Sequence, residues 1–175
     1  MKLQIARYLL TLALVVSSAA IAGNGNGKGP EGAFNPHPRP IIGTLTGEVA
    51  FPLNDECEGI TGAWWQTTTV AVGEMDHFGL TEHYSTHCAT LDGMSLVGGE
   101  ASFVAANGDE LWTTYTGQVL APPPVIAILA EYVVTGGTGR FEGASGTIMA
   151  MVYVTFVGME APNPIELDFA GTIAY

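Results

Sequence analysis

The stretch Gly136-Gly137-Thr138-Gly139-Arg140-Phe141-Glu142-Gly143-Ala144-Ser145-Gly146 decides the fold. It holds five glycines in eleven residues and lies between two apolar, β-type runs, residues 128–135 and 147–157. Glycine at this density permits positive φ angles and close backbone approach, which indicates a shaped connection between two strands. It is not a nucleotide-binding loop, because a dinucleotide fingerprint needs glycine where Glu142 stands and a phosphate loop needs a Lys-Ser/Thr pair.

Beyond residue 40 the chain consists of apolar or alternating runs separated by turns rich in Gly, Pro, Asn and Asp. No run has helical periodicity; a short helix competes only at residues 125–135, where β-branched side chains favour a strand. The sequence predicts eight strands, at residues 42–51, 64–73, 78–86, 95–105, 110–120, 125–135, 147–157 and 165–174.

Several of these runs alternate, so that every second residue belongs to an apolar face. The expected apolar faces are Leu45, Val49 and Phe51; Val97, Ala101 and Phe103; Ile148, Ala150, Val152, Val154 and Phe156; and Ile165, Leu167, Phe169, Gly171 and Ile173. Residues 147–157 differ, because Met149, Met151 and Tyr153 make the second face apolar too. That face needs cover, and we expect a loop or the subunits of a homo-oligomer to supply it.

Eight short strands without crossover helices predict an all-β, eight-stranded antiparallel up-and-down barrel. Closure removes exposed strand edges and leaves an interior that side chains fill or that holds one small ligand. A two-sheet sandwich is the alternative.

Residues 135–146, TGGTGRFEGASG, resemble the strand-turn-strand signature of the allene oxide cyclase and dirigent superfamily. The match is closer to bacterial secreted relatives, which share the Ala106-Asn107-Gly108-Asp109 turn, a Thr/Tyr-rich strand after it, and a step similar to His77-Phe78-Gly79. The resemblance implies a calycin-like barrel with an apolar cavity, trimeric in plant members. The catalytic residues of the plant members have no counterparts that can be placed here, so no activity is carried over.

The first 22 residues are typical of a secretory signal peptide, with Lys2 and Arg7 before an apolar run and Ala20-Ile21-Ala22 at the cut. The apolar run is shorter than the ~20 residues of a membrane span. We therefore expect a signal peptide at 1–22, a disordered Gly/Asn/Pro linker at 23–40 and a barrel domain at 41–175, secreted or periplasmic.

After removal of the leader, 17 acidic residues stand against Lys28, Arg39 and Arg140. This charge disfavours nucleic acid as a partner and suits solubility outside the cell, with adaptation to high salt as the alternative. Cys57 and Cys88 are an even count in an exported chain, which favours a disulfide over two buried thiols.

Aromatic side chains are the main candidates for a ligand site, because they stack on apolar ligands and offer a polar handle. Core or interface packing explains them equally well, and of the adjacent Trp64 and Trp65 only one can line a cavity. Arg140 either clamps the glycine turn, through backbone carbonyls or by pairing with Glu142 or Asp109, or binds a ligand carboxylate at the barrel mouth. The expected ligand-binding residues are Trp64, Phe103, Tyr115, Tyr132 and Arg140.

His83, Ser85 and His87 share one side of a strand, and imidazole suits zinc or copper. We interpret them as a solvated polar face and expect no metal and no cofactor. Glu100 and Glu131 are placed on outer faces, and no nucleophile elbow is present, so no catalytic residue is assigned.

The sequence thus predicts a barrel that binds a small apolar ligand or serves as a stable oligomeric module, without enzymatic activity. The alternative is a cyclase- or dirigent-like catalyst that guides a reactive apolar intermediate. An acid in the pocket would favour the catalyst, and an interior filled by its own side chains would favour the structural role.

Overall fold

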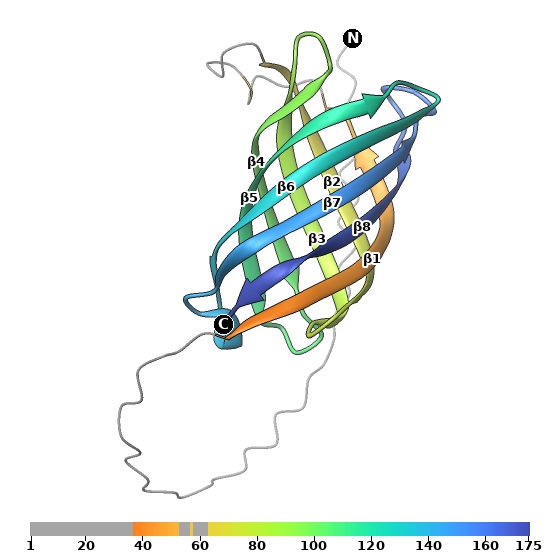
Figure 1. Ribbon diagram of the computed structural model, residues 1–175. Helices are drawn as coiled ribbons and strands as arrows, with labels where there is room; N and C mark the ends of the chain where they lie inside the picture. The colour runs from red at the N-terminus through yellow and green to blue at the C-terminus, as the bar shows by residue number, and fades with distance from the viewer. Residues whose placement is uncertain (1–36, 53–56, 58–62) are drawn as a thin grey trace, which may run out of the picture. The chain divides into compact units, whose positions relative to one another are not determined.

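The computed structural model describes residues 37–52, 57 and 63–175, without the side chains of residues 63 and 64; the predicted signal peptide and most of the predicted linker lie outside this part. The described chain forms eight strands and one 3-10 turn (Figure 1). They are β1 (Pro38–Ala50), β2 (Ala63–Met75), β3 (Gly79–Thr90), β4 (Ser95–Val104), β5 (Glu110–Ala121), β6 (Val125–Gly137), η1 (Gly139–Phe141), β7 (Ser145–Thr155) and β8 (Asn163–Ala174). Within these residues, no helix has the length and apolar character needed to cross a membrane.

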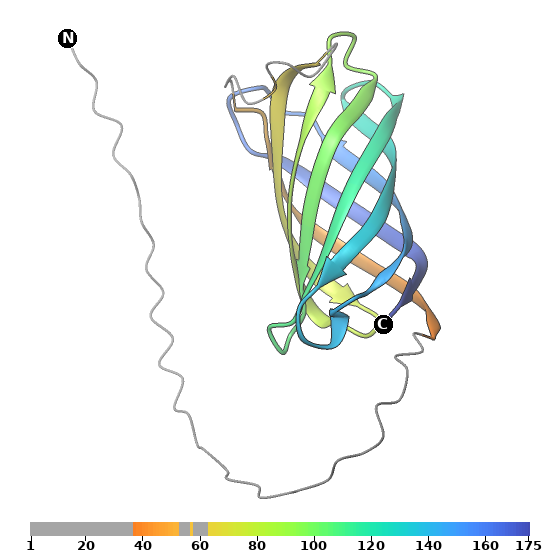
Figure 2. The same cartoon turned by 90° about the vertical axis from the view of Figure 1, so that its left-hand side faces the viewer.

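The strands form one closed antiparallel barrel (Figures 1 and 2). Each strand pairs with the next along the chain, and β8 pairs with β1 to close the circle. The predicted eight-stranded up-and-down barrel is confirmed, including the strand at residues 125–135. The two-sheet sandwich is wrong, because a sandwich would leave β1 and β8 as edges instead of pairing them.

β1 begins at Pro38, four residues before the expected start at residue 42. Pro38 and Pro40 pair with Ala174 and Thr172 of β8. Residues 38, 40 and 42 alternate along β1, so their backbone N–H and C=O positions point to the same side of the strand. The carbonyl of Ile42 accepts a hydrogen bond from the Asp76 N–H, which lies on the side of β1 away from β8. The missing N–H groups of both prolines therefore face that other side, where pairing with β2 begins only at Gly43. Proline is tolerated in a strand where its nitrogen needs no partner.

Alternation places the predicted apolar faces of β1, β7 and β8 inside the barrel. The centre of the interior is aromatic, with Phe103, Tyr132 and Phe169 in mutual edge-to-face contact at centroid distances of 5.2–6.0 Å. Burial of rings of this size is the largest single source of stability in such a core. The second face of β7, with Met149 and Tyr153, points outward and is exposed.

The predicted inner face of β4 is wrong at Val97. Leu96 is buried instead, and Val97 is only half-buried. The register shifts on both sides of this point, between Thr86 and Cys88 toward β3 and between Leu96 and Gly99 toward β5. A bulge inserts one extra residue into a strand, so the residues before it point to the opposite side from the one that alternation predicts. Counting every second residue back from Ala101 therefore gives the wrong inner residue at Val97.

The glycine-rich stretch forms the η1 turn and places Phe141 in one end of the barrel, the lower end in Figure 1. Gly139 has φ of 55°, and a Cβ there would lie 2.0 Å from the Asp109 carboxylate, so only glycine fits. Phe141 is fully buried and stacks on Phe78 at 4.5 Å, and Tyr175 meets its edge at 4.9 Å. These three rings close this end of the barrel.

The expected disulfide is present. Cys57 and Cys88 are bonded with Cα atoms 5.8 Å apart, which joins the segment before β2 to the end of β3. The bridge closes a loop across 31 residues of sequence, and both cysteines are buried.

We expect replacement of both cysteines by alanine to lower the free energy of unfolding by about 3–4 kcal/mol, because the loop entropy of the unfolded chain is no longer restricted. Urea titration followed by tryptophan fluorescence measures the change. The wild-type protein treated with reductant is the matched control and should show the same loss. Equal unfolding midpoints for the oxidised and the double-alanine proteins would show that the bridge does not stabilise the barrel.

Candidate functional site

A cavity of about 120 Å³ lies inside the barrel at the end opposite η1. This is the upper end in Figure 1, where the β3–β4 turn is found. All eight strands contribute to its wall, which is mainly apolar: the contributors include Val49, Phe51, Leu96, Ile126, Val154 and Ile165. Small side chains, Ala89 and Ala130, leave the space that larger rings occupy at the other end. No charged side chain lines the cavity among the described residues.

A few polar groups converge on this apolar space from β2, β3 and β5. They are Thr67, Thr69, Ser85, His87 and Tyr115. The central pair is His87 and Tyr115, whose Nδ1 and hydroxyl oxygen are 2.7 Å apart in a buried hydrogen bond. An apolar pocket with a small number of placed polar groups is the usual form of a small-molecule site.

Burial keeps both members of this pair uncharged. Desolvation lowers the pKa of His87 to about 4, and it raises the pKa of the Tyr115 hydroxyl far above its ordinary value of 10. At neutral pH the hydroxyl donates to Nδ1 in one imidazole tautomer and accepts from it in the other. The pair can thus offer either a donor or an acceptor to a neutral ligand.

The rings beneath the cavity hold Tyr115 in place. Tyr115 stacks on Tyr132 at a centroid distance of 4.5 Å and an interplanar angle of 15°. Tyr132 in turn packs against the edges of Phe103 and Phe169. Because this layer is fully buried, the hydroxyl that meets His87 is attached to a ring with little freedom to move.

His83 lies one layer deeper, two residues before Ser85 on the same face of β3. Its ring is fully buried, 4.6 Å from Phe103 and 5.7 Å from Phe169 between centroids. Neither ring nitrogen has a hydrogen-bond partner. Desolvation lowers the pKa of His83 to about 4, opposed in part by the nearby backbone of Ser102. The core therefore holds a neutral imidazole with unpaired polar atoms.

The expected ligand-binding residues are only partly brought together. Tyr115 and Tyr132 line the cavity, and Phe103 lies in the layer beneath it. The side chain of Trp64 lies outside the described residues, and its neighbour Trp65 lines the cavity.

Arg140 lies at the opposite end of the barrel from the cavity. Its Nε is 3.7 Å from Asp109 Oδ2, and its Nη2 donates to Asn107 Oδ1 at 3.3 Å. We expected an Arg140 that clamps the glycine turn to pair with Glu142 or Asp109, and the contact with Asp109 is present. Arg140 also donates its backbone N–H to the Asp109 carboxylate at 3.3 Å.

The interpretation of His83, Ser85 and His87 as a solvated face is wrong, because all three are buried inside the barrel. Alternation within β3 did not reveal this, since the outward residues Glu82 and Thr86 are polar as well. The register with β4, which places His83 opposite Phe103, does reveal it. Sequence reasoning therefore missed His87 and Ser85 as cavity residues. In the described part of the chain, no three His, Cys, Asp or Glu side chains converge as a metal site would require.

Comparison with known proteins gives a likeness in structure. Two solved structures of pterocarpan synthase dirigent proteins superpose on the chain. One has a TM-score of 0.52 and 14% identity over 88% of this chain and 99% of its own. The other has a TM-score of 0.51 and 11% identity over 79% and 96%. The fold is that of the dirigent proteins. No protein-family model and no curated sequence matches the chain.

The dirigent-type barrel of this chain carries a testable pH dependence in its two buried histidines. Their pKa values in the folded state, about 4, lie below the ordinary 6.5. The unfolded chain therefore binds more protons between these limits, and stability falls as pH falls through that window. We expect a loss of about 2 kcal/mol per histidine between pH 7 and pH 4.5, measured by urea unfolding.

The variant His83→Phe provides the control, because it fills the same aromatic layer without a titrating group. Its loss of stability between the two pH values should be half that of the wild type, whatever its absolute stability. The lowered pKa values of Asp92 and Asp109 affect stability only below about pH 4 and do not disturb the comparison. An unchanged pH dependence in His83→Phe would contradict the assignment.

Proposed function

We propose that the protein is a secreted barrel that binds one small, neutral, ring-sized apolar molecule in the cavity beside His87 and Tyr115. The observation that carries the proposal is the combination of an unfilled apolar space of about 120 Å³ with a buried hydrogen-bonding pair on its wall. An apolar cavity of about 150 Å³ accepts benzene, so the size suits a single aromatic ring. A hydroxyl on that ring would meet the His87–Tyr115 pair.

The residues that line the cavity favour a ligand without charge. With no Lys, Arg, Asp or Glu among the described lining residues, an ionised ligand would be desolvated without a partner. Arg140, at the other end of the barrel, takes no part in this proposal. A purely structural role is less well supported, because side chains fill the η1 end of the interior but not this end.

Secretion is part of the proposal. The disulfide between Cys57 and Cys88 suits an oxidising compartment such as the periplasm or the cell exterior. The acidic composition, with 17 acidic against five basic residues, suits a soluble exported protein.

A dirigent-like catalyst is the second candidate function. It is favoured by the fold likeness to proteins described as pterocarpan synthase dirigent proteins. The buried His87–Tyr115 pair could move a proton to or from an enclosed intermediate, since it connects two groups that each exchange one. No carboxylic acid lines the cavity in the described residues, and this favours binding over catalysis. Recovery of a ring-sized ligand chemically unchanged after long incubation supports the binder, and a converted product supports the catalyst.

Phenol and toluene form a matched probe pair, because they differ by one hydroxyl at similar volume. We expect both to quench tryptophan emission saturably through Trp65 on the cavity wall. Tyr115→Phe removes one half of the polar pair and should weaken phenol binding about 5- to 10-fold, with toluene affinity little changed.

Ala89→Leu is the second variant, because it fills the cavity and should weaken both probes together. Fluorescence titration and thermal unfolding with each probe measure the effects. Absence of saturable binding by both probes would refute the ligand-binding function and leave the structural role.

We also propose that the barrel self-associates through the outer face of β6 and β7. Leu129, Met149 and Tyr153 are exposed there, and Met151 is half-buried beside Leu129. Exposed apolar side chains gathered in this way are commonly covered by a partner, and the exposed Glu131, opposite Met149, borders them.

Met151→Lys should therefore convert an oligomer into a monomer while the far-ultraviolet circular dichroism stays unchanged. Thr46→Lys, an exposed position on β1, is the matched control and should leave the mass unchanged. Static light scattering at micromolar concentration gives the mass. A monomeric wild-type protein would rule out this face as an interface.

A further inference from the structure

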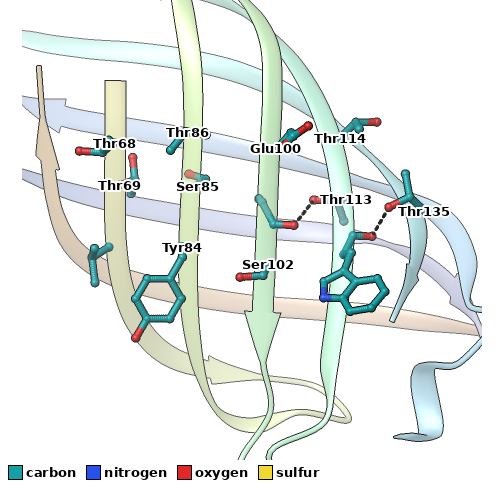
Figure 3. A pocket seen from close by; sticks show the side chains of 13 residues that line it. Thr68, Thr69, Tyr84, Ser85, Thr86, Glu100, Ser102, Thr113, Thr114 and Thr135 are labelled. Atoms are coloured by element: carbon teal, nitrogen blue, oxygen red, sulfur yellow. Dashed lines mark hydrogen bonds between the residues drawn. The ribbon is translucent and has the colours of Figure 1, made fainter. Parts of the chain in front are cut away.

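A second hollow lies on the outside of the barrel, across β2 to β5 and reaching Thr135 of β6, with a volume of about 500 Å³. Figure 3 shows it from close by, with Tyr84 beside a floor of hydroxyl side chains that includes Ser102 and Thr86. Trp112 lines it as well, and Tyr84 and Trp112 are each 44% exposed. We call this hollow the outer groove. The strands of the barrel wall lie between the outer groove and the inner cavity, and Thr69 and Ser85 of that wall line both.

Strand register fixes the layout of the outer groove. Tyr84 of β3 lies opposite Ser102 of β4, which lies opposite Trp112 of β5. With neighbouring strands about 4.8 Å apart, the two aromatic residues stand roughly 10 Å apart at their Cα atoms. The small side chain of Ser102 leaves the space between them open.

Each aromatic ring is held by a carboxylate two residues earlier on its own strand. The Tyr84 hydroxyl donates to Glu82 at 2.8 Å, and Trp112 Nε1 donates to Glu110 at 2.9 Å. Glu82 and Glu110 both lie opposite Val104 of β4, so the two ring–carboxylate pairs are arranged symmetrically about that strand. The polar edges of both rings are thereby satisfied, and what remains for a ligand is their faces.

The next row of outward residues carries hydrogen-bonding groups that are not in use. Thr86, Glu100 and Thr114 are opposite one another across β3, β4 and β5. Within the described residues, these three side chains and Ser102 make no side-chain hydrogen bond, and Figure 3 shows them together on the groove wall. These four residues offer three hydroxyls and one carboxylate, and neither lysine nor arginine is among the residues that line the groove.

We propose that the outer groove is a binding site for a neutral oligosaccharide. The face of a sugar ring presents C–H groups, which are attracted to the negative face of an aromatic ring. The rim of the same sugar presents hydroxyls, which act as donors and acceptors toward Thr86, Ser102, Thr114 and the Glu100 carboxylate. Fixed aromatic faces beside unpaired hydroxyl and carboxylate groups match both sides of such a ligand.

Charge and shape distinguish this ligand from three others. An anionic glycan would meet Glu100 in the groove, with Glu82 and Glu110 beside its two rings, and no Lys or Arg among the lining residues would offset them. A second copy of the chain would have to desolvate the same carboxylates, and Arg39 and Arg140 are the only Lys or Arg residues in the described part. An organic cation is best bound by rings that enclose it, whereas this groove is open along one side.

Titration with cellohexaose, xylohexaose and mannohexaose tests the proposal, with isothermal calorimetry and tryptophan emission as readouts. We expect saturable binding of at least one of them by the wild-type protein. Tyr84→Ala and Trp112→Ala should each weaken that binding about tenfold or more, because each removes one stacking face. Both positions are exposed, so circular dichroism should show an unchanged barrel.

Ile42→Ala is the matched control, since Ile42 is an exposed apolar side chain on β1, outside both the groove and the proposed self-association face. It should leave the affinity per subunit unchanged. Each of four results would overturn the proposal: no binding of any hexasaccharide at millimolar concentration, equal loss in Ile42→Ala and Trp112→Ala, tighter binding of tetramethylammonium than of the sugars, or a change in molar mass caused by Trp112→Ala.

Discussion

The pairing of β1 with β8 is the constraint on which the rest of the structure depends. It runs from Pro38 opposite Ala174 to Val49 opposite Asn163 and turns an eight-stranded sheet into a closed barrel. A closed barrel has no sheet edges, and its strand number limits the interior to side chains and one small space. Every inward residue is thereby placed against residues from across the barrel, far away in sequence. That is why His83 of β3 meets Phe169 of β8.

The size of the inward side chains then determines where the interior is full and where it is open. At the η1 end, Phe78 and Phe141 stack and close the barrel. At the other end, Ala89 and Ala130 stand where larger residues would fill the space, and a cavity remains. Protein interiors are close-packed, so an unfilled space beside a hydrogen-bonding pair is an informative departure. The glycine-rich turn and the cavity are thus features of opposite ends of one core.

The sequence alone revealed the elements but not their mutual arrangement. The alternation in β8 predicted the inner face, because apolar residues there mostly alternate with polar ones. In β7 the predicted inner face is correct although the outer face carries Met149, Met151 and Tyr153. The same rule failed in β4, where a bulge shifts the phase at Val97, and in β3, where both faces are polar. The cavity residues His87 and Ser85 become recognisable only when β3 is paired with β2 and β4, and no local sequence pattern encodes the register of these pairs. The disulfide was predictable, because two cysteines allow a single pairing.

Alternation also explains how one small barrel presents two unrelated surfaces. On β5, Tyr115 faces the cavity, and its neighbour Thr114 faces the outer groove. On β3, Ser85 points inward between the outward residues Tyr84 and Thr86. A substitution on one face leaves backbone pairing intact, so its effect on the other face is small unless the strand shifts its register.

A register shift of one residue would exchange the two faces, placing Tyr84 and Trp112 inside the barrel and the His87–Tyr115 pair outside. The buried aromatic layer of Phe103, Tyr132 and Phe169 opposes such a shift, because each ring would leave the core. The core that leaves the cavity open is therefore also what keeps the outer groove in register.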